Sequence, residues 1–355
     1  IRWGIVGSGM MGIEHINNFK LTPGATIVAL ADPVATSLAM SQRAIGHEVA
    51  TFANAAALAA SGLCDAVVVS SPNFTHHDLL GPLMDAKLHI LCEKPLCTTL
   101  ADARAIATRA KGYDRIFWTA MEYRYMPPVA DYVAQLHAGR VGKLQMLSIR
   151  EHRFPFLVKV GDWNRFAKNT GGTMVEKCCH FFDLMRLIVQ AEPVRVYCSG
   201  GNDVNHQDER YGGQKPDIID NSYTTVDFAN GVRAMLDLSM FAEGAEQQEE
   251  ICAVGDKARL EVFIPKGEIV YSPRVGFMNP KQVERRIVEV DAAALAAGHH
   301  HGASFYSHAA FARAVRGEGK IEVTADDGLR AVAMGLAAEI SAKEHRVVDM
   351  AELGL

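Results

Sequence analysis

The chain carries the stretch Gly7-Ser8-Gly9-Met10-Met11-Gly12, which matches the spacing G-x-G-x-x-G. The stretch directly follows an apolar segment, Arg2–Val6, that reads as a β-strand, and it opens a helical pattern over residues 10–19. In this strand–turn–helix context the spacing indicates a dinucleotide-binding turn. The first glycine permits a tight turn, the second lets the backbone approach a pyrophosphate, and the third allows close packing of helix on strand. A glycine-rich turn without a ligand is the alternative interpretation.

Asp32 ends the second apolar segment, about 20 residues after Gly12. This is the usual place of a carboxylate that hydrogen-bonds the ribose hydroxyls of a dinucleotide. Its charge would repel a 2′-phosphate, and the following Pro33-Val34 supplies no arginine to hold one. We therefore expect NAD rather than NADP as the cofactor. A simple turn residue before Pro33 is the alternative.

The first 120 residues alternate short apolar segments with helical ones. The expected strands are Arg2–Val6, Thr26–Ala31, Ala66–Ser70, Leu88–Cys92 and Ile116–Thr119. The expected helices are Met10–Phe19, Val34–Ile45, Ala55–Ser61, His77–Ala86 and Thr99–Lys111. Buried strands rich in Val and Ile, separated by helices, imply parallel pairing with right-handed crossovers. The pattern predicts an α/β domain with a doubly wound parallel sheet over residues 1–124.

The rhythm changes at residue 125. A helix over Val129–Ala138 leads into a long strand, Lys143–Arg153, and the chain then becomes strand-rich up to about residue 290. Asn230-Gly231 and Gly255-Asp256 each separate two such strands, and Asn-Gly readily takes the positive φ angles of a type I′ hairpin turn. We expect residues 125–355 to form an α+β domain with a large open, mainly antiparallel sheet.

Two helical segments close the chain, Ser304–Arg316 and Ala325–Ala342. Thr324 and Asp327 form a capping-box-like start to the second of these. This second helix, at about 325–342, is the part of the second domain that we expect to pack back on the first.

Composition excludes several classes of protein. The 355 residues include 36 Lys and Arg against 41 Asp and Glu, a net charge of −5, without a cluster of basic residues. A nucleic-acid or anionic-membrane surface is therefore disfavoured. No apolar run reaches the ~20 residues of a membrane span. Seven cysteines indicate reduced thiols rather than a disulfide framework, and with Ile1 already in an apolar strand we expect no signal peptide and a cytoplasmic protein.

Lys94 is the first candidate for chemistry. It lies in Cys92-Glu93-Lys94-Pro95, at the end of the fourth expected strand. Ligands bind at the carboxyl edge of such sheets, where a partly desolvated lysine beside a cofactor can exchange protons. Pro95 stiffens the chain, and a cis bond before it is possible. A surface lysine without a role is the alternative.

The block Gly171–Asp183 is the second candidate. It contains Glu176, His180 and Asp183, which would share one face of a helix. A histidine flanked by carboxylates can be held in one tautomer and accept a proton, although this spacing also arises by chance. Cys178-Cys179 is expected to be buried apolar filling. The cluster His299-His300-His301 has no partners at zinc spacing, so we expect no metal site and read it as a solvated or substrate-side loop.

The chain resembles the glucose-fructose oxidoreductase / inositol dehydrogenase family of NAD(P)-dependent sugar and cyclitol dehydrogenases. The resemblance covers nearly the whole chain. It rests on the Gly7–Gly12 turn, Asp32, Ser71-Pro72-Asn73-Phe74-Thr75-His76, Glu93-Lys94-Pro95, Tyr123-Arg124 and the Gly171–Asp183 block. It implies an N-terminal Rossmann domain and a C-terminal α/β domain whose open sheet joins subunits in a homo-oligomer, a dimer or a tetramer.

The resemblance also implies roles for individual residues. The cofactor would be bound by Gly7, Ser8, Gly9, Met10, Met11, Gly12, Asp32, Ser71, Pro72, Asn73, His76, Glu93, Lys94 and Arg124. Lys94 and His180 would touch the reacting hydroxyl. The family usually has an aspartate four residues before the histidine, whereas this chain has Glu176 followed by Lys177. Glu176 is still a catalytic and substrate-binding candidate, which would either contact the substrate or hold His180, and its longer side chain would let the pocket admit a different sugar geometry.

Residues 153–165 supply further substrate candidates. Trp163 could stack on a sugar ring, with a core position as an equal alternative. Arg153, Lys159 and Arg165 hint at a substrate that is negatively charged or rich in hydrogen-bonding groups, although scattered surface charge explains them as well.

The first functional hypothesis is an NAD-dependent dehydrogenase of a sugar, an inositol or a related polyol. Hydride would leave a secondary carbinol carbon while His180 takes the hydroxyl proton and Lys94 stabilises the alkoxide. A second is a glycosidase that uses tightly bound NAD in a transient oxidation–elimination cycle. A third is a non-catalytic NAD-binding regulator, which would need neither Lys94 nor His180.

Overall fold

The computed structural model describes residues 1–355 and separates into two compact units. The first unit comprises Ile1–Met126 and Val290–Val332, and the second Pro127–Glu289 and Ala333–Leu355. The expected division placed all of 125–355 in one domain. The structure differs because residues 290–332 return to the first unit, where α11 (Ala303–Val315) packs against α1 (Met10–Leu21).

The first unit is built on a six-stranded parallel sheet in the order β3-β2-β1-β4-β5-β6. Its strands are β1 (Arg2–Val6), β2 (Thr26–Ala31), β3 (Ala50–Phe52), β4 (Ala66–Val69), β5 (His89–Cys92) and β6 (Phe117–Thr119). Its other helices are α2 (Ala35–Ile45), α3 (Ala55–Ala60), α4 (His76–Asp85), α5 (Leu100–Ala110) and α10 (Ala292–Ala296), with short turns η1 (Asn73–Thr75) and η2 (Glu122–Tyr125). This confirms the doubly wound parallel sheet.

Strand order determines where a ligand can bind in this unit. The chain runs outward from β1 through β2 to β3 and then crosses back to β4 on the other side of β1. The carboxyl ends of β1 and β4 therefore flank the switch point, which is where ligands bind in open α/β sheets. Strand β4 is buried along its whole length, as expected for an inner parallel strand.

The core of the first unit combines the N-terminal strand with a helix from late in the chain. The Trp3 ring lies 4.1 Å from the Phe19 ring and 5.2 Å from the Phe311 ring, centroid to centroid. All three side chains are buried. Because the contact joins β1, α1 and α11, the segment 290–332 is an integral part of this unit.

The second unit is built on a nine-stranded sheet in the order β14-β13-β12-β11-β7-β10-β9-β8-β15. Its strands are β7 (Leu144–His152), β8 (Pro193–Gly201), β9 (Asn221–Phe228), β10 (Arg233–Ser239), β11 (Glu249–Gly255), β12 (Ala258–Ile264), β13 (Glu268–Pro273), β14 (Glu284–Ile287) and β15 (Val348–Asp349). Only β7 and β10 pair in parallel, so the sheet is mainly antiparallel, as predicted.

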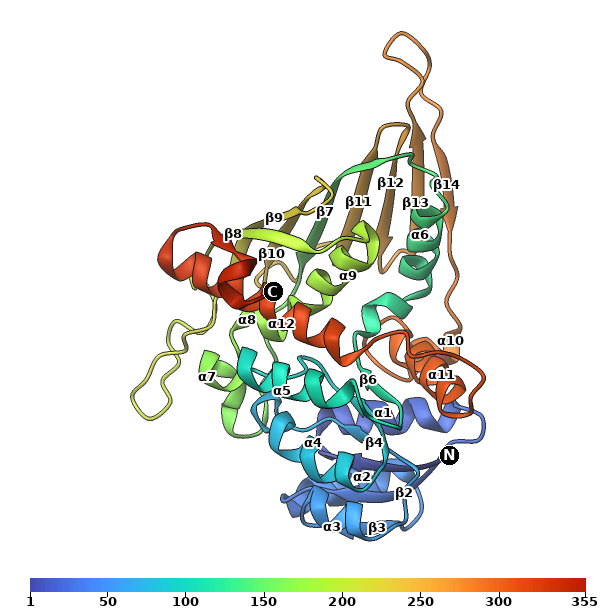
Figure 1. Cartoon of the computed structure of the whole chain (residues 1–355), viewed down its shortest axis with the longest axis vertical. Helices are drawn as coiled ribbons and strands as arrows, with labels where there is room; N and C mark the ends of the chain where they lie inside the picture. Colours follow the sequence, from blue (N-terminus) through green and yellow to red (C-terminus); the bar gives the residue numbers. More distant parts are fainter. The chain divides into compact units, whose positions relative to one another are not determined.

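Helices cover one face of this sheet. They include α6 (Pro127–His137), which contacts β12, and α9 (Cys179–Val189), which contacts β7 (Figure 1). Shorter helical segments precede and follow: η3 (Val160–Arg165), α7 (Ala167–Thr170), α8 (Thr173–Glu176) and η4 (Met350–Leu353). The long helix α12 (Ala325–Glu344) runs from the first unit into the second. No helix is both long and apolar enough to cross a bilayer.

The turn at Asn230-Gly231 differs from the predicted type. It joins β9 to β10 in an antiparallel hairpin, as expected. Gly231 takes a positive φ of 86°, but Asn230 does not, whereas a type I′ turn needs positive φ at both central residues. The turn is instead closed by hydrogen bonds from Gly231 N to Phe228 O (2.9 Å) and from Phe228 N to Val232 O (3.0 Å).

The start of α12 carries the predicted cap. The Thr324 hydroxyl accepts a hydrogen bond from the N–H of Asp327 (3.1 Å), and the Asp327 carboxylate accepts one from the N–H of Thr324 (2.8 Å). These reciprocal bonds satisfy backbone donors that the first helical turn leaves without intrahelical partners.

Candidate active site

The glycine turn after β1 is shaped by close backbone approach. A Cβ on Gly7 (φ 90°) would lie 2.4 Å from Ser71 N, and one on Gly12 would lie 2.5 Å from Gly7 O. Nothing lies within 4 Å of the Cβ position of Gly9. Gly9 is the N-cap of α1 and brings no side-chain cap, so the first N–H groups of the helix are available to an anion. The turn fits a pyrophosphate.

Ser8, Met10 and Met11 complete the turn. Ser8 is buried, and its main-chain oxygen accepts a hydrogen bond from the Ser41 hydroxyl (2.8 Å). Met10 is exposed, and Met11 is half-buried. Ser8 can therefore reach a cofactor through its backbone more readily than through its buried side chain, whereas the side chain of Met10 is exposed.

Asp32 lies at the end of β2, opposite the glycine turn. Its Oδ2 accepts a hydrogen bond from Ser8 N and its Oδ1 accepts one from Val34 N, both at 2.8 Å. The side chain is largely buried. No basic side chain forms an ion pair with it, so nothing at this edge offsets the repulsion between a carboxylate and a 2′-phosphate.

The segment after β4 contains Ser71, Pro72, Asn73 and His76. Asn73 is buried at the start of η1. His76 is fully enclosed, with Nδ1 2.9 Å from Pro95 O and Nε2 3.1 Å from Ser71 O. Burial lowers the pKa of His76. His76 thus links the two loops that follow β4 and β5, and this geometry supports a positioning role toward a cofactor rather than direct contact.

Glu93 and Lys94 follow β5, and the Lys94–Pro95 peptide bond is cis. Glu93 is buried, and its Oε1 lies 2.9 Å from His15 Nε2 while its Oε2 accepts a hydrogen bond from Lys94 N (3.0 Å). Burial raises the pKa of Glu93, but the hydrogen bond and charge of His15, together with Lys94, outweigh it and leave the pKa below its usual value. Lys94 is half-buried beside this carboxylate.

Five titratable residues near Glu93 were not predicted as site residues. They are Glu14 and His15 on α1, Glu122 in η2, His300 in the loop after α10, and His308 on α11. His300 Nδ1 lies 2.8 Å from Glu14 Oε1, and His300 Nε2 lies 3.9 Å from Glu122 Oε1. The histidine cluster at 299–301 was the available signal, but nothing in the sequence distinguishes the inward His300 from its neighbours.

Glu14 and Glu122 differ sharply in pKa. Burial raises the pKa of Glu14, but the charge and hydrogen bond of His300 and the charge of His15 lower it to about 2. Burial and the nearby Glu93 charge raise the pKa of Glu122 to about 7, although His300 and Lys94 act in the opposite direction. Glu14 is therefore a permanent carboxylate at neutral pH, while Glu122 exchanges a proton there.

Arg124 has partners within the first unit. Its Nη1 donates to Glu322 O (3.1 Å), and its Nη2 lies 3.6 Å from Asp327 Oδ1. Only 11% of its side chain is exposed. These contacts tie η2 to the start of α12, so the predicted cofactor contact of Arg124 requires an arginine that also anchors this helix.

The Gly171–Asp183 block does not form one helix. Glu176 ends α8, and His180 and Asp183 lie on α9. Between them the N–H groups of Lys177 (2.9 Å) and Cys178 (3.2 Å) both bond to Thr173 O. The expected shared face of Glu176 and His180 on a continuous helix is therefore wrong, because the hydrogen-bond ladder is interrupted. The side chains of Glu176, His180 and Asp183 are all buried.

Gly172, which precedes α8, occupies a position that only glycine fits. Its φ is 92°, and a Cβ there would lie 2.2 Å from Glu339 Oε1. The Glu339 carboxylate fills this space and accepts a hydrogen bond from Met174 N (2.9 Å). Burial raises the pKa of Glu339 to about 7.

A second set of buried charges lies next to the block. Lys177 Nζ is 2.9 Å from Glu151 Oε1, and Arg153 Nη1 is 3.6 Å from the same oxygen. Glu249 faces Glu151 across the β7–β11 pair. Burial lowers the pKa of Lys177, while burial and the Glu151 charge raise the pKa of Glu249 to about 7. The sequence could have predicted that Glu151 is buried, because it lies on the same face of the strand as the apolar Leu147 and Ile149.

The remaining substrate candidates have protein partners. Arg165 is buried and bonded to Glu209 (2.9 Å), so it is not a surface charge open to a ligand. The Arg153 guanidinium also lies 4.3 Å from the Phe154 ring centroid. Trp163 is half-buried, and Lys159 Nζ lies 5.9 Å from its ring centroid. Cys178 and Cys179 are buried, as predicted, and burial raises the pKa of Cys178 well above its usual value.

A parallel doubly wound sheet with a glycine turn, an acid after β2 and a Glu-Lys-Pro segment after β5 defines a dinucleotide-binding Rossmann protein. Residues 1–121 match the oxidoreductase family with an NAD-binding Rossmann fold, and residues 133–350 match the C-terminal α/β domain of the same family. The chain belongs to this glucose-fructose oxidoreductase / inositol dehydrogenase (Gfo/Idh/MocA) family. It is an NAD-binding oxidoreductase, which confirms the predicted family and cofactor.

Known relatives and solved structures agree with this assignment. The chain is 28% identical over 271 residues to a myo-inositol 2-dehydrogenase of Thermotoga maritima, covering 76% of this chain and 74% of the relative. It is 26% identical over 357 residues to an inositol 2-dehydrogenase of Rhizobium meliloti, covering 99% of both. A levoglucosan dehydrogenase, solved with NADH and levoglucosan, has the same fold with a TM-score of 0.84 at 18% identity, covering 99% of both chains.

Proposed function

We propose that this chain is an NAD-dependent dehydrogenase that transfers a hydride between a secondary hydroxyl carbon of a sugar, an inositol or a related polyol and the nicotinamide. The observation that carries the proposal is the alignment with an inositol 2-dehydrogenase across 99% of both chains. The presence of both Lys94 and His180 supports catalysis, because a protein that only binds NAD needs neither.

The chain's own residues would bind the dinucleotide and move the hydroxyl proton. The N–H groups at the start of α1 would hold the pyrophosphate, and Asp32 would accept hydrogen bonds from the adenosine ribose. When bound, NAD supplies the hydride acceptor. His180 would accept the proton of the reacting hydroxyl, and the Lys94 ammonium would stabilise the developing alkoxide. Glu176, Arg153 and Trp163 are proposed substrate contacts.

A substrate panel tests this proposal. The purified protein is mixed with NAD and, in turn, with inositols, aldoses and anhydrosugars, and the appearance of NADH is followed by its absorbance. Steady accumulation of NADH with one class of polyol is the expected result. Product formation from a glycoside without net NADH would instead identify the oxidation–elimination cycle, and silence across the panel would contradict a dehydrogenase of these substrates.

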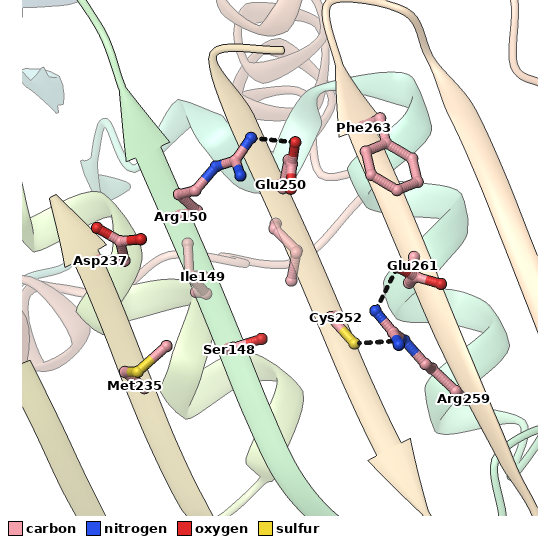
Figure 2. Close-up of a pocket in the computed structure, with 11 residues that line it drawn as sticks. Ser148, Ile149, Arg150, Met235, Asp237, Glu250, Cys252, Arg259, Glu261 and Phe263 are labelled. Atoms are coloured by element: carbon pink, nitrogen blue, oxygen red, sulfur yellow. Dashed lines mark hydrogen bonds and ion pairs between the residues drawn. The ribbon is translucent and has the colours of Figure 1, made fainter. Parts of the chain in front are cut away.

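We also propose that the chain forms a homo-oligomer through the uncovered face of the large sheet. This face presents Met146 (57% exposed) on β7 and Tyr223 (65% exposed) on β9, the two strands that flank β10. Figure 2 shows a hollow on it where Met235 and Phe263 lie among paired charges such as Arg150 and Glu250. Apolar side chains mixed with paired charges suit a surface that meets another subunit.

A further inference from the structure

Oxidation of a carbinol releases one proton for every hydride. The hydride carries two electrons to the nicotinamide, and the hydroxyl proton must reach solvent before the next turnover. Lys94, which we place beside the reacting hydroxyl, adjoins a cluster of buried acids and histidines in the first unit. The following inference rests on the proposed dehydrogenase function.

Two series of neighbouring side chains lead away from Glu93 and Lys94. One runs from Glu93 to His15 (2.9 Å) and on to His308 (2.8 Å). It ends against the Phe19 ring, whose centroid lies 4.2 Å from that of His308. His308 is fully buried, and burial together with the His15 charge places its pKa well below the usual value. This first series leads into the apolar core and offers a proton no path to solvent.

The second series of side chains, through Glu122 and His300, reaches the surface. Glu122 is almost fully buried, with 4% of its side chain exposed, and its charged neighbours are Glu93, Lys94 and His300. Its Oε1 lies 3.9 Å from Nε2 of His300, a separation that one water molecule or a small side-chain rotation can bridge. The His300 side chain is 23% exposed. A proton on Glu122 is therefore one transfer away from a solvent-accessible imidazole.

The contacts of His300 orient it for this transfer. Its Nδ1 faces Glu14 Oε1 at 2.8 Å, and the same oxygen accepts a hydrogen bond from the Ser304 hydroxyl (3.0 Å). Glu14 remains a carboxylate at neutral pH. It therefore favours the tautomer in which Nδ1 carries the hydrogen and Nε2 presents its lone pair toward Glu122. The neighbouring Tyr123 ring lies 6.2 Å from the imidazole, centroid to centroid.

We propose that Glu122 and His300 form the exit path for the proton released by the reaction. The Lys94 ammonium gives a proton to the Glu122 carboxylate, which becomes a neutral acid, and Lys94 is reprotonated by the hydroxyl proton that His180 has accepted. Glu122 then passes the proton to Nε2 of His300, and the resulting imidazolium releases it to water. One proton enters and one leaves in each turnover, and no other co-reactant is needed. Glu14 and Ser304 are positioning residues that act through His300.

Kinetics of matched variants test the path. Glu122→Gln reproduces the shape of the protonated acid, so the fold is retained, but the side chain cannot carry a proton. We expect Glu122→Gln and His300→Ala to lower kcat by about 100-fold, the lower end of the range for a positioned proton-transfer group, with the Kd for NAD unchanged. Added imidazole should restore kcat in His300→Ala but not in Glu122→Gln. The matched control is His299→Gln, an exposed neighbour in the same loop, which should retain wild-type kcat.

A titration without substrate provides a second, independent readout. Wild type should release one more proton than Glu122→Gln, with a midpoint near pH 7. In His300→Gln this midpoint should move upward, because His300 lowers the pKa of Glu122 when it is protonated and glutamine cannot take up that charge. An unmoved midpoint, or a full kcat in Glu122→Gln, would overturn the proposal. If no polyol is oxidised, the proposed function fails, and the titration still decides whether Glu122 and His300 share a proton.

Discussion

The main-chain N–H of Ser8 donates a hydrogen bond of 2.8 Å to Oδ2 of Asp32, which ties the glycine turn to the end of β2. The same carboxylate accepts a second bond from Val34 N through Oδ1. Asp32 therefore fixes the geometry of the turn in addition to presenting a negative charge where the adenosine ribose is expected. Its substitution should separate these two effects.

Asp32→Ala is expected to weaken NAD binding by about 10- to 100-fold, the range for losing a charge-assisted hydrogen bond. NADP binding should weaken less, because the repulsion of its 2′-phosphate is also removed. Asp32→Asn keeps one acceptor for Ser8 N and loses the charge, so it should narrow the NAD preference with a smaller loss of affinity. Fluorescence titrations with both dinucleotides measure this. A wild-type protein that prefers NADP would contradict the assignment.

His180→Ala should lower kcat by about 10²–10⁴-fold, the usual contribution of a general base. The glycine turn and Asp32 belong to a different unit of the chain, so the Kd for NAD should change little. His47→Gln, at an exposed histidine, is the control for a nonspecific effect. Retained turnover across the neutral pH range would place the base elsewhere, with Lys94 or Lys177 as the next candidates. Loss of NAD binding with early unfolding would show a purely structural role.

Local pattern was enough to predict five of the six strands of the first unit. Strands such as Thr26–Ala31 were predicted at their observed bounds because their apolar runs are long and are bounded by turn residues. Strand β3 was missed because three residues, Ala50–Phe52, carry no period. It is held by pairing with β2, including the bond from Asp32 N to Phe52 O (3.1 Å), and such pairing is a tertiary property.

The site was predictable where one segment supplies it and not where distant segments meet. The glycine turn and Glu93-Lys94 are local motifs, whereas Glu14, Glu122 and His300 come together from three parts of the chain. The break between α8 and α9 was also hidden. Residues 173–189 suit a helix throughout, and the interruption arises where the Lys177 side chain enters the buried ion cluster with Glu151.

The outward face of the large sheet should hold the oligomer together. A stable interface buries ~800 Å² on each partner, and Met235 lies near the middle of this face on β10 (Figure 2). Met235→Glu should dissociate the assembly, because a charge would be buried without a partner. Met40→Glu, at an exposed methionine of the first unit, is the control. Light scattering reports the mass, and a wild-type particle of 38.6 kDa at micromolar concentration would reject the proposal.

Removing one member of the Lys177–Glu151 pair should lower the free energy of unfolding more than replacing both members by apolar residues does. Both side chains are at most 5% exposed, so Lys177→Met leaves Glu151 buried next to Glu249, with only the longer 3.6 Å contact of Arg153 to balance its charge. We expect this to lower the free energy of unfolding by about 3–5 kcal/mol. The double variant Lys177→Met/Glu151→Leu removes the stranded charge and should recover much of the loss. Urea unfolding of wild type, both single variants and the double variant gives the coupling energy, and strictly additive effects would argue against the pair.

Glu339 should make the protein less stable as the pH rises from about 4.5 to about 7. Burial raises the pKa of its carboxyl from 4.5 to about 7, with a further contribution from Asp217. The folded state thus holds this proton more tightly than the unfolded chain does. The unfavourable contribution is absent below about pH 4.5, grows as the pH rises, and is complete above about pH 7.

Glu339→Gln removes this ionisation and keeps a carbonyl oxygen that can accept from Met174 N. The variant should match wild type near pH 4.5 and exceed it by about 3 kcal/mol near pH 8, since each pKa unit corresponds to about 1.4 kcal/mol. Urea unfolding at both pH values measures the difference. A gain of equal size at both would mean that the substitution acts through packing against Gly172 rather than through the charge.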